Sequence, residues 1–257
     1  MRLVMHGGVV EYEDEGTGPV LTLVHGDPGR PGDFRWMIPF LSSRFRVLRI
    51  ALPGLDLTDL SVNSSPEISA RATFIRQVLD RLQIDQTILL GHSMGSALVL
   101  EHGVHWPDKT RGVVLLNPVG PSPHKAFKSL RDNPLLPLLE TPLRPLLLMV
   151  MHKAFTRAGF PKGVSKSALL HVIRCVRAFD FDRHIQNLQS LSVPCLRIHS
   201  KDDPLISMKH FVELERLIKP GMSHIFEQAG HNPQKTNPES LSLIINEWAQ
   251  EHGLFDD

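Results

Sequence analysis

The stretch that decides the fold is TILLGHSMGSALVL, residues 87–100. It opens with an apolar run typical of a buried strand and closes with an apolar run at helical spacing. Between the two, Ser93 stands flanked by Gly91 and Gly95. A sharp turn from strand to helix presents one side chain at the end of the strand, and glycines let neighbouring backbone approach without a Cβ. The sequence therefore predicts a nucleophile elbow with Ser93 at its tip.

Strand-like and helix-like segments alternate along most of the chain. This alternation is typical of a mostly parallel sheet covered by helices. A turn-forming EGTGP segment joins the first two strand runs, which are therefore expected to be antiparallel. The expected strands are residues 9–14, 20–24, 46–50, 87–90, 112–116, 193–199 and 224–227, and the clearest helices are residues 68–82, 94–106, 208–218 and 239–250.

The alternation stops between residues 120 and 191. This segment contains proline-punctuated helical sequence and offers no convincing strand. We interpret it as a helical cap inserted into an α/β core made of residues 1–119 and 192–257. The cap either adds packing helices or covers a functional site.

Composition bounds the classes of partner. The 257 residues include 28 Lys or Arg and 27 Asp or Glu, a formal net charge of +1, which gives no electrostatic case for nucleic acid or an anionic membrane. Two cysteines, Cys175 and Cys195, favour a reducing compartment, and a cytoplasmic location is expected. The N-terminus lacks a signal-peptide pattern, and prolines and charges interrupt the longest apolar stretch, so no membrane span is expected. No residues show metal-ligand spacing, so neither metal nor cofactor is expected.

A serine nucleophile needs a base, and the base needs an orienting acid. His231 lies in AGHNP, a loop between the last strand-like run and the last helix. Asp202 and Asp203 both follow the preceding strand-like run and compete for the role of acid. The order serine, acid, histidine is the one that this triad takes on α/β sheets.

The oxyanion donors are expected from two turns. The amide of Met94 lies at the N-terminus of the helix after Ser93, where the helix dipole favours negative charge. The HGDPG turn after residues 20–24 places the Asp27 amide as the second donor. Because an inward carboxylate would oppose the developing charge, the Asp27 side chain is expected to point to solvent or to cap a turn.

Taken together, these motifs resemble the α/β-hydrolase superfamily over nearly the whole chain. The resemblance implies a mostly parallel eight-stranded sheet with helices on both faces and an inserted cap. It also implies Asp203 as the acid, because the family acid follows a G-x-x-D pattern and Ser200 takes the place of the glycine. After Leu52-Pro53-Gly54 the chain departs from the family, since Leu55 to Asp59 replace a small residue and glycine. The residues that carry the resemblance are HGDP at 25–28, LPG at 52–54, GHSMG at 91–95, SKDDP at 200–204 and GHNP at 230–233.

The cap is expected to form an apolar roof above Ser93, built by its many Leu, Met and Phe residues. Leu138, Leu147 and Met151 are taken as its substrate-binding residues. His92, next to the nucleophile, is expected to be a packed, hydrogen-bonded residue that also borders the substrate.

The leading hypothesis is a serine hydrolase that cleaves a carboxylic ester, or a related activated carbonyl, of a hydrophobic small molecule, acting as a monomer or homodimer. The main alternative is a carbon–carbon bond hydrolase acting on a vinylogous diketone. That family usually has asparagine at the position of His92 and tryptophan at that of Asn232, and both differ here. A lyase, a synthase or a ligand receptor of the same fold remain further alternatives.

Overall fold

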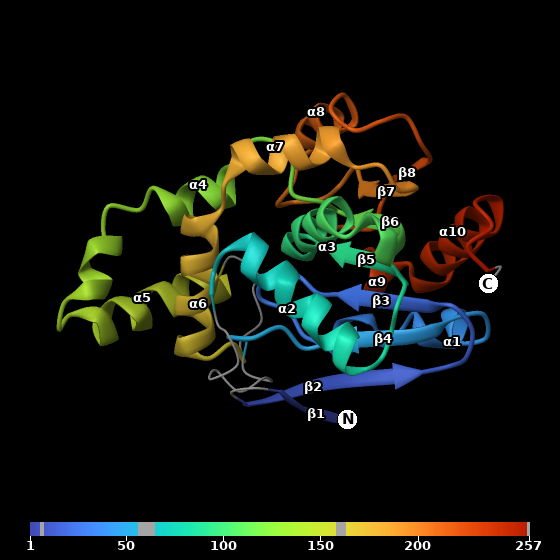
Figure 1. The fold of residues 1–257 in the computed structure, drawn as a ribbon. Helices are drawn as coiled ribbons and strands as arrows, with labels where there is room; N and C mark the ends of the chain where they lie inside the picture. The colour runs from blue at the N-terminus through green and yellow to red at the C-terminus, as the bar shows by residue number, and fades with distance from the viewer. Residues whose placement is uncertain (6–7, 56–64, 158–162, 256–257) are drawn as a thin grey trace.

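The computed structural model describes residues 1–5, 8–55, 65–157 and 163–255. Within them the chain forms one eight-stranded sheet in the order β1-β2-β4-β3-β5-β6-β7-β8 (Figure 1). β1 and β2 are antiparallel to their neighbours, and the strands from β4 to β8 in this order are parallel. The strands are β1 (Arg2–Met5), β2 (Gly8–Glu15), β3 (Val20–Val24), β4 (Arg46–Ile50), β5 (Thr87–His92), β6 (Thr110–Leu116), β7 (Cys195–Ser200) and β8 (Ser223–Phe226).

The central strands are apolar throughout because both of their faces are covered. Along β5, Ile88 and Leu90 face one hydrophobic core and Leu89 faces the other. Successive side chains of a strand point to opposite faces, so a strand buried on both sides reads as a continuous apolar run. This explains why the 87–90 run carries no alternation of polar and apolar residues.

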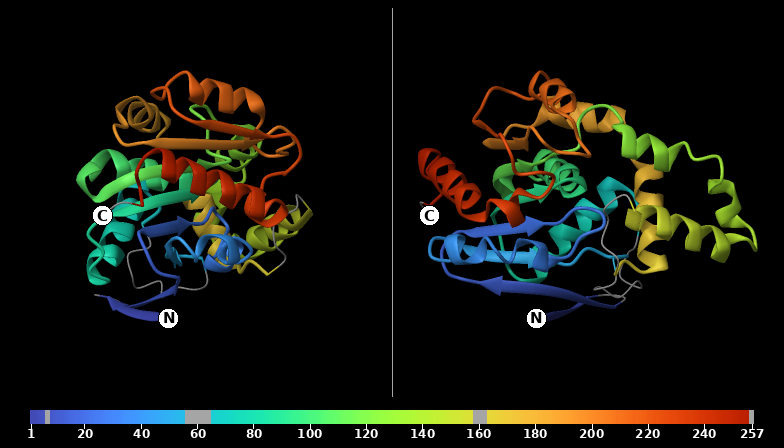
Figure 2. Two further views of the ribbon diagram at one scale, coloured as in Figure 1. Left: turned by 90° about the vertical axis from the view of Figure 1, so that its right-hand side faces the viewer. Right: turned by 180° about the vertical axis from the view of Figure 1, so that it is seen from behind.

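Helices cover both faces of the sheet (Figures 1 and 2). One core joins the sheet to α2, α3 and α8, and the other joins it to η1, α1 and α10. None of the helices in the described part of the chain has the length and apolar character needed to cross a membrane. These elements are η1 (Pro31–Phe34), α1 (Ile38–Leu41), α2 (Ile68–Arg81), α3 (Met94–His105), η2 (Pro107–Lys109), α8 (Met208–Glu215), α9 (Pro233–Thr236) and α10 (Pro238–Glu251).

The described part of the segment between β6 and β7 contains five helices joined by turns, and no strand. In Figure 1 and in the right-hand view of Figure 2, α4, α5 and α6 project from the sheet. α7 instead packs against α3, and Arg183 of α7 forms an ion pair with the buried Glu101 of α3. The boundaries 120 and 191 stay predictions. The elements are α4 (Lys125–Arg131), η3 (Leu136–Glu140), α5 (Arg144–Arg157), α6 (Lys166–Ala178) and α7 (Phe181–Ser190).

One pairing differs from the sequence interpretation. β2 is antiparallel as expected, but it hydrogen-bonds to β4 and not to β3, the strand that follows it. β3 instead lies between β4 and β5, and the short connection from β2 crosses to it. A turn motif predicts a reversal of direction, but it does not determine which strand becomes the neighbour.

Candidate active site

The elbow between β5 and α3 holds Ser93 in a conformation that serine rarely adopts. Its backbone lies at φ 53° and ψ −120°, and its amide donates to the Leu116 carbonyl at 3.0 Å. The backbone of this turn lies too close to its neighbours for a side chain at either glycine. A Cβ on Gly91 would lie 2.3 Å from the Gly95 carbonyl oxygen, and a Cβ on Gly95 would lie 2.4 Å from the Val24 carbonyl oxygen. The two glycines are therefore required sterically, and strain of this kind is typical of functional turns.

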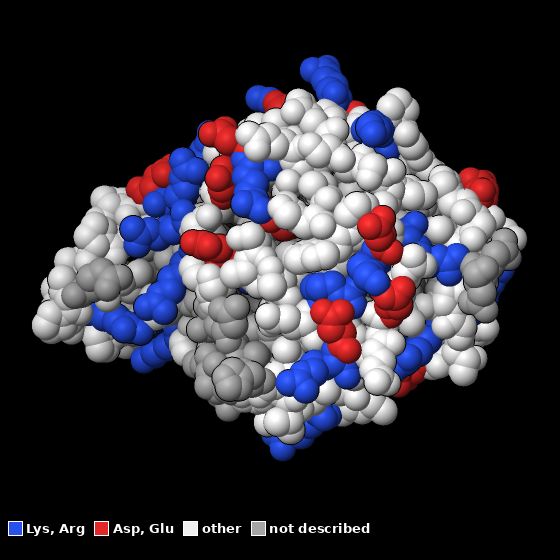
Figure 3. Space-filling model, viewed as in Figure 1, with Lys and Arg blue, Asp and Glu red and all other residues white. Residues whose placement is uncertain are grey.

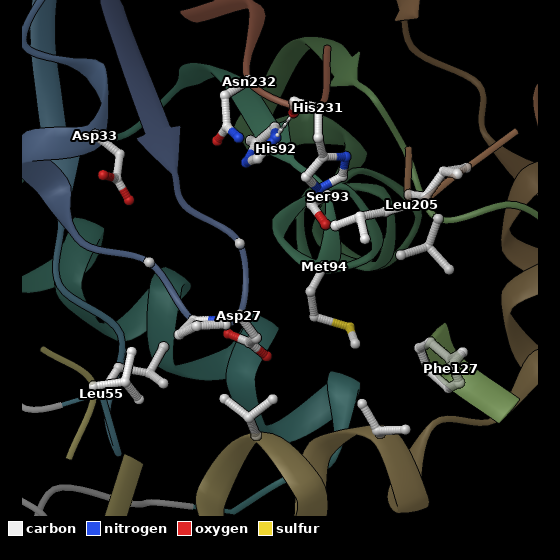
Figure 4. Close-up of a pocket in the computed structure, with 18 of the residues that line it drawn as sticks. Asp27, Asp33, Leu55, His92, Ser93, Met94, Phe127, Leu205, His231 and Asn232 are labelled. Atoms are coloured by element: carbon white, nitrogen blue, oxygen red, sulfur yellow. Dashed lines mark hydrogen bonds between the residues drawn. The ribbon is translucent and has the colours of Figure 1, made fainter. Parts of the chain in front are cut away.

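Asp203 and His231 meet at the same edge of the sheet. The Nδ1 atom of His231 lies 2.7 Å from Oδ2 of Asp203, and the two side chains are 12% and 0% exposed. Figure 4 shows the His231 ring beside the Ser93 side chain. Parallel strands bring their carboxyl ends to one edge, so the loops after β5, β7 and β8 converge although their residues are far apart in sequence. With Nδ1 on the carboxylate, the other ring nitrogen, Nε2, is the one available to act as a base.

Four hydrogen bonds fix the Asp203 carboxylate. Oδ1 accepts from the amides of Leu205 (2.8 Å) and Ile206 (3.0 Å), and Oδ2 accepts from Asn117 Nδ2 (2.7 Å) as well as from His231. Burial opposes ionisation of this carboxyl, but its hydrogen bonds and the charge of His231 outweigh burial and lower its pKa to about 2. Asp203 is therefore an anion at neutral pH.

Asp202, the competing candidate, has a different environment. Its Oδ1 accepts from the amides of Ala229 (2.9 Å) and Gly230 (2.8 Å). These bonds tie the loop after β7 to the loop that carries His231. Of the two carboxylates, it is Asp203 that contacts the histidine ring.

A cavity of about 760 Å³ opens beside Ser93, His231 and Met94. Its volume is in the range of sites for small molecules. One side is polar and includes Arg30, Asp33, Asn232 and Lys235, with Lys235 paired to Asp33 at 2.8 Å. The other side, toward the cap, is mostly apolar, and Figure 4 places Phe127 and Leu205 there. The apolar lining comprises Val119, Phe127, Leu130, Val164, Ala168, Val172, Val176, Leu205 and Ile206.

The turn after β3 lies directly against the elbow. A Cβ on Gly26 would lie 3.0 Å from Ser93 Cβ, so the residue before Asp27 is in close contact with Ser93. As the first residue of α3, Met94 has an amide that no carbonyl of its own helix can satisfy. Both expected amide donors therefore belong to backbone that borders Ser93.

The side chain of Asp27 does not point to solvent, contrary to our expectation. It is 1% exposed and forms a bidentate ion pair with Arg71 of α2, at 2.6 and 2.7 Å. Burial alone would raise the pKa of Asp27, but the Arg71 guanidinium holds it below the ordinary value. In Figure 4 the carboxylate points away from Ser93. The negative charge that seemed unfavourable beside an oxyanion is thus neutralised by a buried cation.

Comparison with known proteins agrees with this geometry. The sequence model of the alpha/beta hydrolase family matches residues 23–242. The chain belongs to the alpha/beta hydrolase family. It is 27% identical over 269 aligned residues to 2-hydroxy-6-oxo-2,4-heptadienoate hydrolase of Pseudomonas putida, covering 96% of this chain and 95% of that protein.

Two solved structures share the fold. A meta-cleavage product hydrolase from Pseudomonas fluorescens has a TM-score of 0.70 at 20% identity, over 98% of this chain and 97% of the other. An esterase from Thermogutta terrifontis has a TM-score of 0.77 at 19% identity, over 95% of this chain and 94% of the esterase. The relatives support hydrolase activity for this alpha/beta hydrolase. They differ among themselves in the bond they cleave.

His92 has the scaffold environment that the sequence suggested. It borders the cavity, and its Nε2 donates to the His231 carbonyl oxygen at 2.7 Å. Burial and the nearby His231 lower its pKa to about 3, so the ring is neutral. In this alpha/beta hydrolase, His92 holds the loop that carries His231, and its contact with substrate stays a prediction.

The three cap residues expected to bind substrate do not border the cavity. Leu147 and Met151 are buried in the hydrophobic core, and Leu138 packs against that core. α5 is apolar on two sides, so its sequence alone does not reveal which side faces the site. The cavity is bordered instead by α6, through Ala168, Val172 and Val176 at a spacing of four. In the sequence, this repeat of small apolar residues every four positions was the pattern that could have indicated the cavity-facing side of α6.

Two polar residues of the site were also missed. Asn117 follows β6, and its side-chain amide donates to Asp203. His124 borders the cavity near the cap, burial lowers its pKa to about 4, and its Nδ1 has no hydrogen-bond partner among the described residues. Of the departure at Leu55–Asp59, Leu55 borders the cavity and residues 56–59 lie outside the described residues. Within the described ranges, no group of three or more His, Cys, Asp or Glu residues could hold a metal ion.

The lowered pKa of Asp203 predicts a pH-dependent stability. A carboxyl whose pKa falls from 3.8 to about 2 on folding stabilises the fold above the higher value, and this stability is lost as pH falls toward the lower one. We expect wild type to lose about 2 kcal/mol of unfolding free energy through this group, and Asp203→Asn to lack this loss. Urea unfolding of both proteins between about pH 5 and pH 2 measures the difference. Asp27 and Asp33 titrate in both proteins, so their contributions cancel in the comparison. A difference in unfolding free energy between the two proteins that stays constant with pH would therefore contradict the prediction.

Proposed function

We propose that this protein is a serine hydrolase that cleaves a carboxylic ester, or a related activated carbonyl, of a hydrophobic small molecule through an acyl-enzyme on Ser93. One observation carries the proposal: the Asp203–His231 pair lies beside Ser93 in a cavity whose far side is apolar. Neither the pair nor the cavity alone would suffice. Together they supply an activated nucleophile and room for an apolar acyl group.

The reaction begins with a proton transfer. His231 Nε2 removes the proton from the Ser93 hydroxyl as the oxygen attacks the carbonyl carbon. Asp203 stays ionised and stabilises the imidazolium that forms, because its carboxylate is already bonded to Nδ1. Asn117 and the amides of Leu205 and Ile206 keep that carboxylate in place.

The carbonyl oxygen becomes an oxyanion in the tetrahedral intermediate. The amides of Met94 and Asp27 are the proposed donors, and the positive end of the α3 dipole adds to their effect. Fixed backbone donors need no reorganisation as charge develops, which is why they lower the barrier. The Asp27–Arg71 pair holds the second donor in a turn with no uncompensated charge.

Two steps complete the cycle. His231 returns its proton to the leaving group, and the carbon–oxygen bond to the leaving alcohol breaks, leaving the acyl group on Ser93. Water then gives a proton to His231, attacks the acyl carbon and releases the carboxylic acid. The proton returns to Ser93, so the enzyme ends as it began.

The lining of the cavity indicates how a substrate is oriented. The side formed by α6, Phe127 and Leu205 favours an apolar acyl or aryl group, because burying apolar surface there releases water. Arg30, Asn232 and the Asp33–Lys235 pair border the other side, where a polar leaving group is better accommodated. His124 offers one neutral polar contact near the apolar side.

A second candidate is carbon–carbon bond hydrolysis of a vinylogous diketone. It is favoured by the relative of 27% identity over nearly the full chain, which is named 2-hydroxy-6-oxo-2,4-heptadienoate hydrolase, because a 2-hydroxy-6-oxo-dienoate is the enol form of such a diketone. It is disfavoured by His92 and Asn232, which occupy the positions of an asparagine and a tryptophan usual in that group. His92 Nε2 is engaged with backbone in this chain.

A direct comparison of substrates separates the two functions. We expect kcat/KM for p-nitrophenyl hexanoate to exceed that for a vinylogous 1,5-diketone by about 100-fold, because a bond to an activated alcohol breaks more easily. We also expect the hexanoyl ester to be preferred to the acetyl ester by about tenfold, since four more methylenes contact the apolar side. Release of p-nitrophenol and loss of the diketone chromophore are the measurements.

The outcomes are distinct. Faster loss of the diketone chromophore would establish carbon–carbon hydrolysis instead. Labelling of Ser93 by a fluorophosphonate without turnover of either substrate would indicate a lyase, synthase or ligand receptor. Absence of labelling at Ser93 would overturn the acyl-enzyme itself.

A further inference from the structure

One side of α5 is apolar and uncovered. Leu143, immediately before α5, and Leu146 and Val150 within it have the spacing of one helix side, and they are 53%, 56% and 53% exposed. The adjacent side of the helix, with Leu147, Leu148 and Met151, packs into the core. Large apolar side chains gathered on one exposed helix face mark an interaction surface more often than isolated ones do. Leu135 and Met149, at 47% and 41%, are further exposed large apolar residues in the described part of the cap.

The cap is strongly basic although the chain as a whole is nearly neutral. Residues 120–191 hold 11 Lys or Arg and four Asp or Glu, a formal charge of +7. The rest of the chain holds 17 Lys or Arg and 23 Asp or Glu, a formal charge of −6. Figure 3 shows Lys and Arg gathered over the lower left, where α5 and α6 lie, with few Asp or Glu among them. Among the cap residues whose exposure the structure describes, the exposed basic ones are Lys125, Lys128, Arg131, Arg144, Lys153, Lys166, Arg174 and Arg177.

We propose that the cap docks on the surface of an anionic lipid bilayer through this face of α5. We call the face the α5 docking surface and define it as Leu143, Leu146 and Val150 with the flanking Arg144 and Lys153. An interfacial helix inserts apolar side chains at the headgroup level while its basic residues bind anionic headgroups. The overall charge of +1 gave no case for an anionic membrane, but the separation of charge within the molecule does.

The charge pattern favours a bilayer over a second copy of the chain. Two caps meeting face to face would bring together two segments that each carry a formal charge of +7, and like charges oppose such a pairing. An anionic bilayer attracts the cap and repels the acidic remainder, so it both binds and orients the molecule. The surface does not depend on which bond the active site cleaves.

Vesicle sedimentation tests the proposal on the full chain. The wild-type protein is expected to partition about tenfold more strongly to vesicles of phosphatidylcholine mixed with phosphatidylglycerol than to phosphatidylcholine alone. Raising the salt concentration is expected to release it, because salt screens the headgroup charge. The double variant Leu146→Ser/Val150→Ser is expected to bind about tenfold more weakly, since two inserted side chains are lost.

Matched variants of the core serve as controls. Leu243 of α10 and Val212 of α8 are 56% and 42% exposed, so Val212→Ser/Leu243→Ser removes similar apolar surface away from the cap and is expected to bind as wild type does. Arg144→Gln/Lys153→Gln is expected to lose the preference for anionic vesicles, whereas Lys219→Gln on the core retains it. Thermal unfolding of every variant checks that the fold is kept.

Three results would overturn the proposal. The first is equal partitioning of the wild-type protein to both kinds of vesicle. The second is an equal loss of binding in the cap and core double variants. The third is a dimer in size-exclusion chromatography that the cap double variant abolishes, because the face would then be an interface between copies.

Discussion

Ser93→Ala is expected to lower kcat for p-nitrophenyl hexanoate by on the order of 10⁵-fold, the scale of loss when a serine nucleophile is removed. The reason is that no other hydroxyl can take its place at the elbow. The Ser93 backbone has a φ of 53°, and the backbone around Gly91 and Gly95 is packed so closely that the elbow cannot adopt another conformation. His231→Ala should cost a similar factor, and the double variant little more, because the two groups act as one unit.

Ser96→Ala is the matched control for Ser93. Ser96 lies one turn further along α3, and its hydroxyl bonds to the Ser93 carbonyl and the Val119 amide. Its loss removes neutral hydrogen bonds and is expected to change kcat by less than about tenfold. Turnover by Ser93→Ala within tenfold of wild type, or equal losses in the two variants, would contradict the assignment of Ser93.

Arg71→Met is expected to lower the free energy of unfolding by about 3 to 5 kcal/mol, because it leaves the Asp27 carboxylate buried without its partner. For a chain of this size, that corresponds to a fall in Tm of roughly 10 °C. The pair is nearly inaccessible to water, at 2% and 1% exposed, so solvent does not replace the lost guanidinium. Chemical denaturation and calorimetry measure both quantities.

A surface pair and a rescue variant make this test specific. Arg46 pairs with Asp14 at 2.7 Å but is 37% exposed, so Arg46→Met is expected to cost about 1 kcal/mol or less. Adding Asp27→Asn to Arg71→Met should recover part of the loss, since it removes the unpaired charge. Equal effects of Arg71→Met and Arg46→Met would show that burial of the Asp27 pair has no special role.

The sequence predicted the sheet well where local pattern determines it. The 87–90 run and the glycines around Ser93 are constrained by backbone geometry within a few residues, and β5 and α3 form as expected. Strand pairing is a long-range property, which is why β2 was assigned the wrong neighbour. β1, only four residues long, was not predicted.

The candidate site divides in the same way. Ser93, Asp203 and His231 each lie at the end of a recognisable strand run, so their proximity could be predicted. Arg71 and Asn117 could not be, because their partners Asp27 and Asp203 are 44 and 86 residues away. One signal was present for Arg71, a charged residue on the apolar side of α2 beside Phe74 and Ile75. The side of α5 that packs inward depends on α6, which no local pattern specifies.

The helices of the cap enter the chain at one place, between β6 and β7, whereas Ser93, Asp203 and His231 come from the loops after β5, β7 and β8. Sequence changes in α4 to α6 can therefore reshape the pocket without moving these three residues. A family built on this plan can diversify its range of substrates while its chemical step stays unchanged. Exchanging cap segments between relatives is accordingly a natural route to new selectivity.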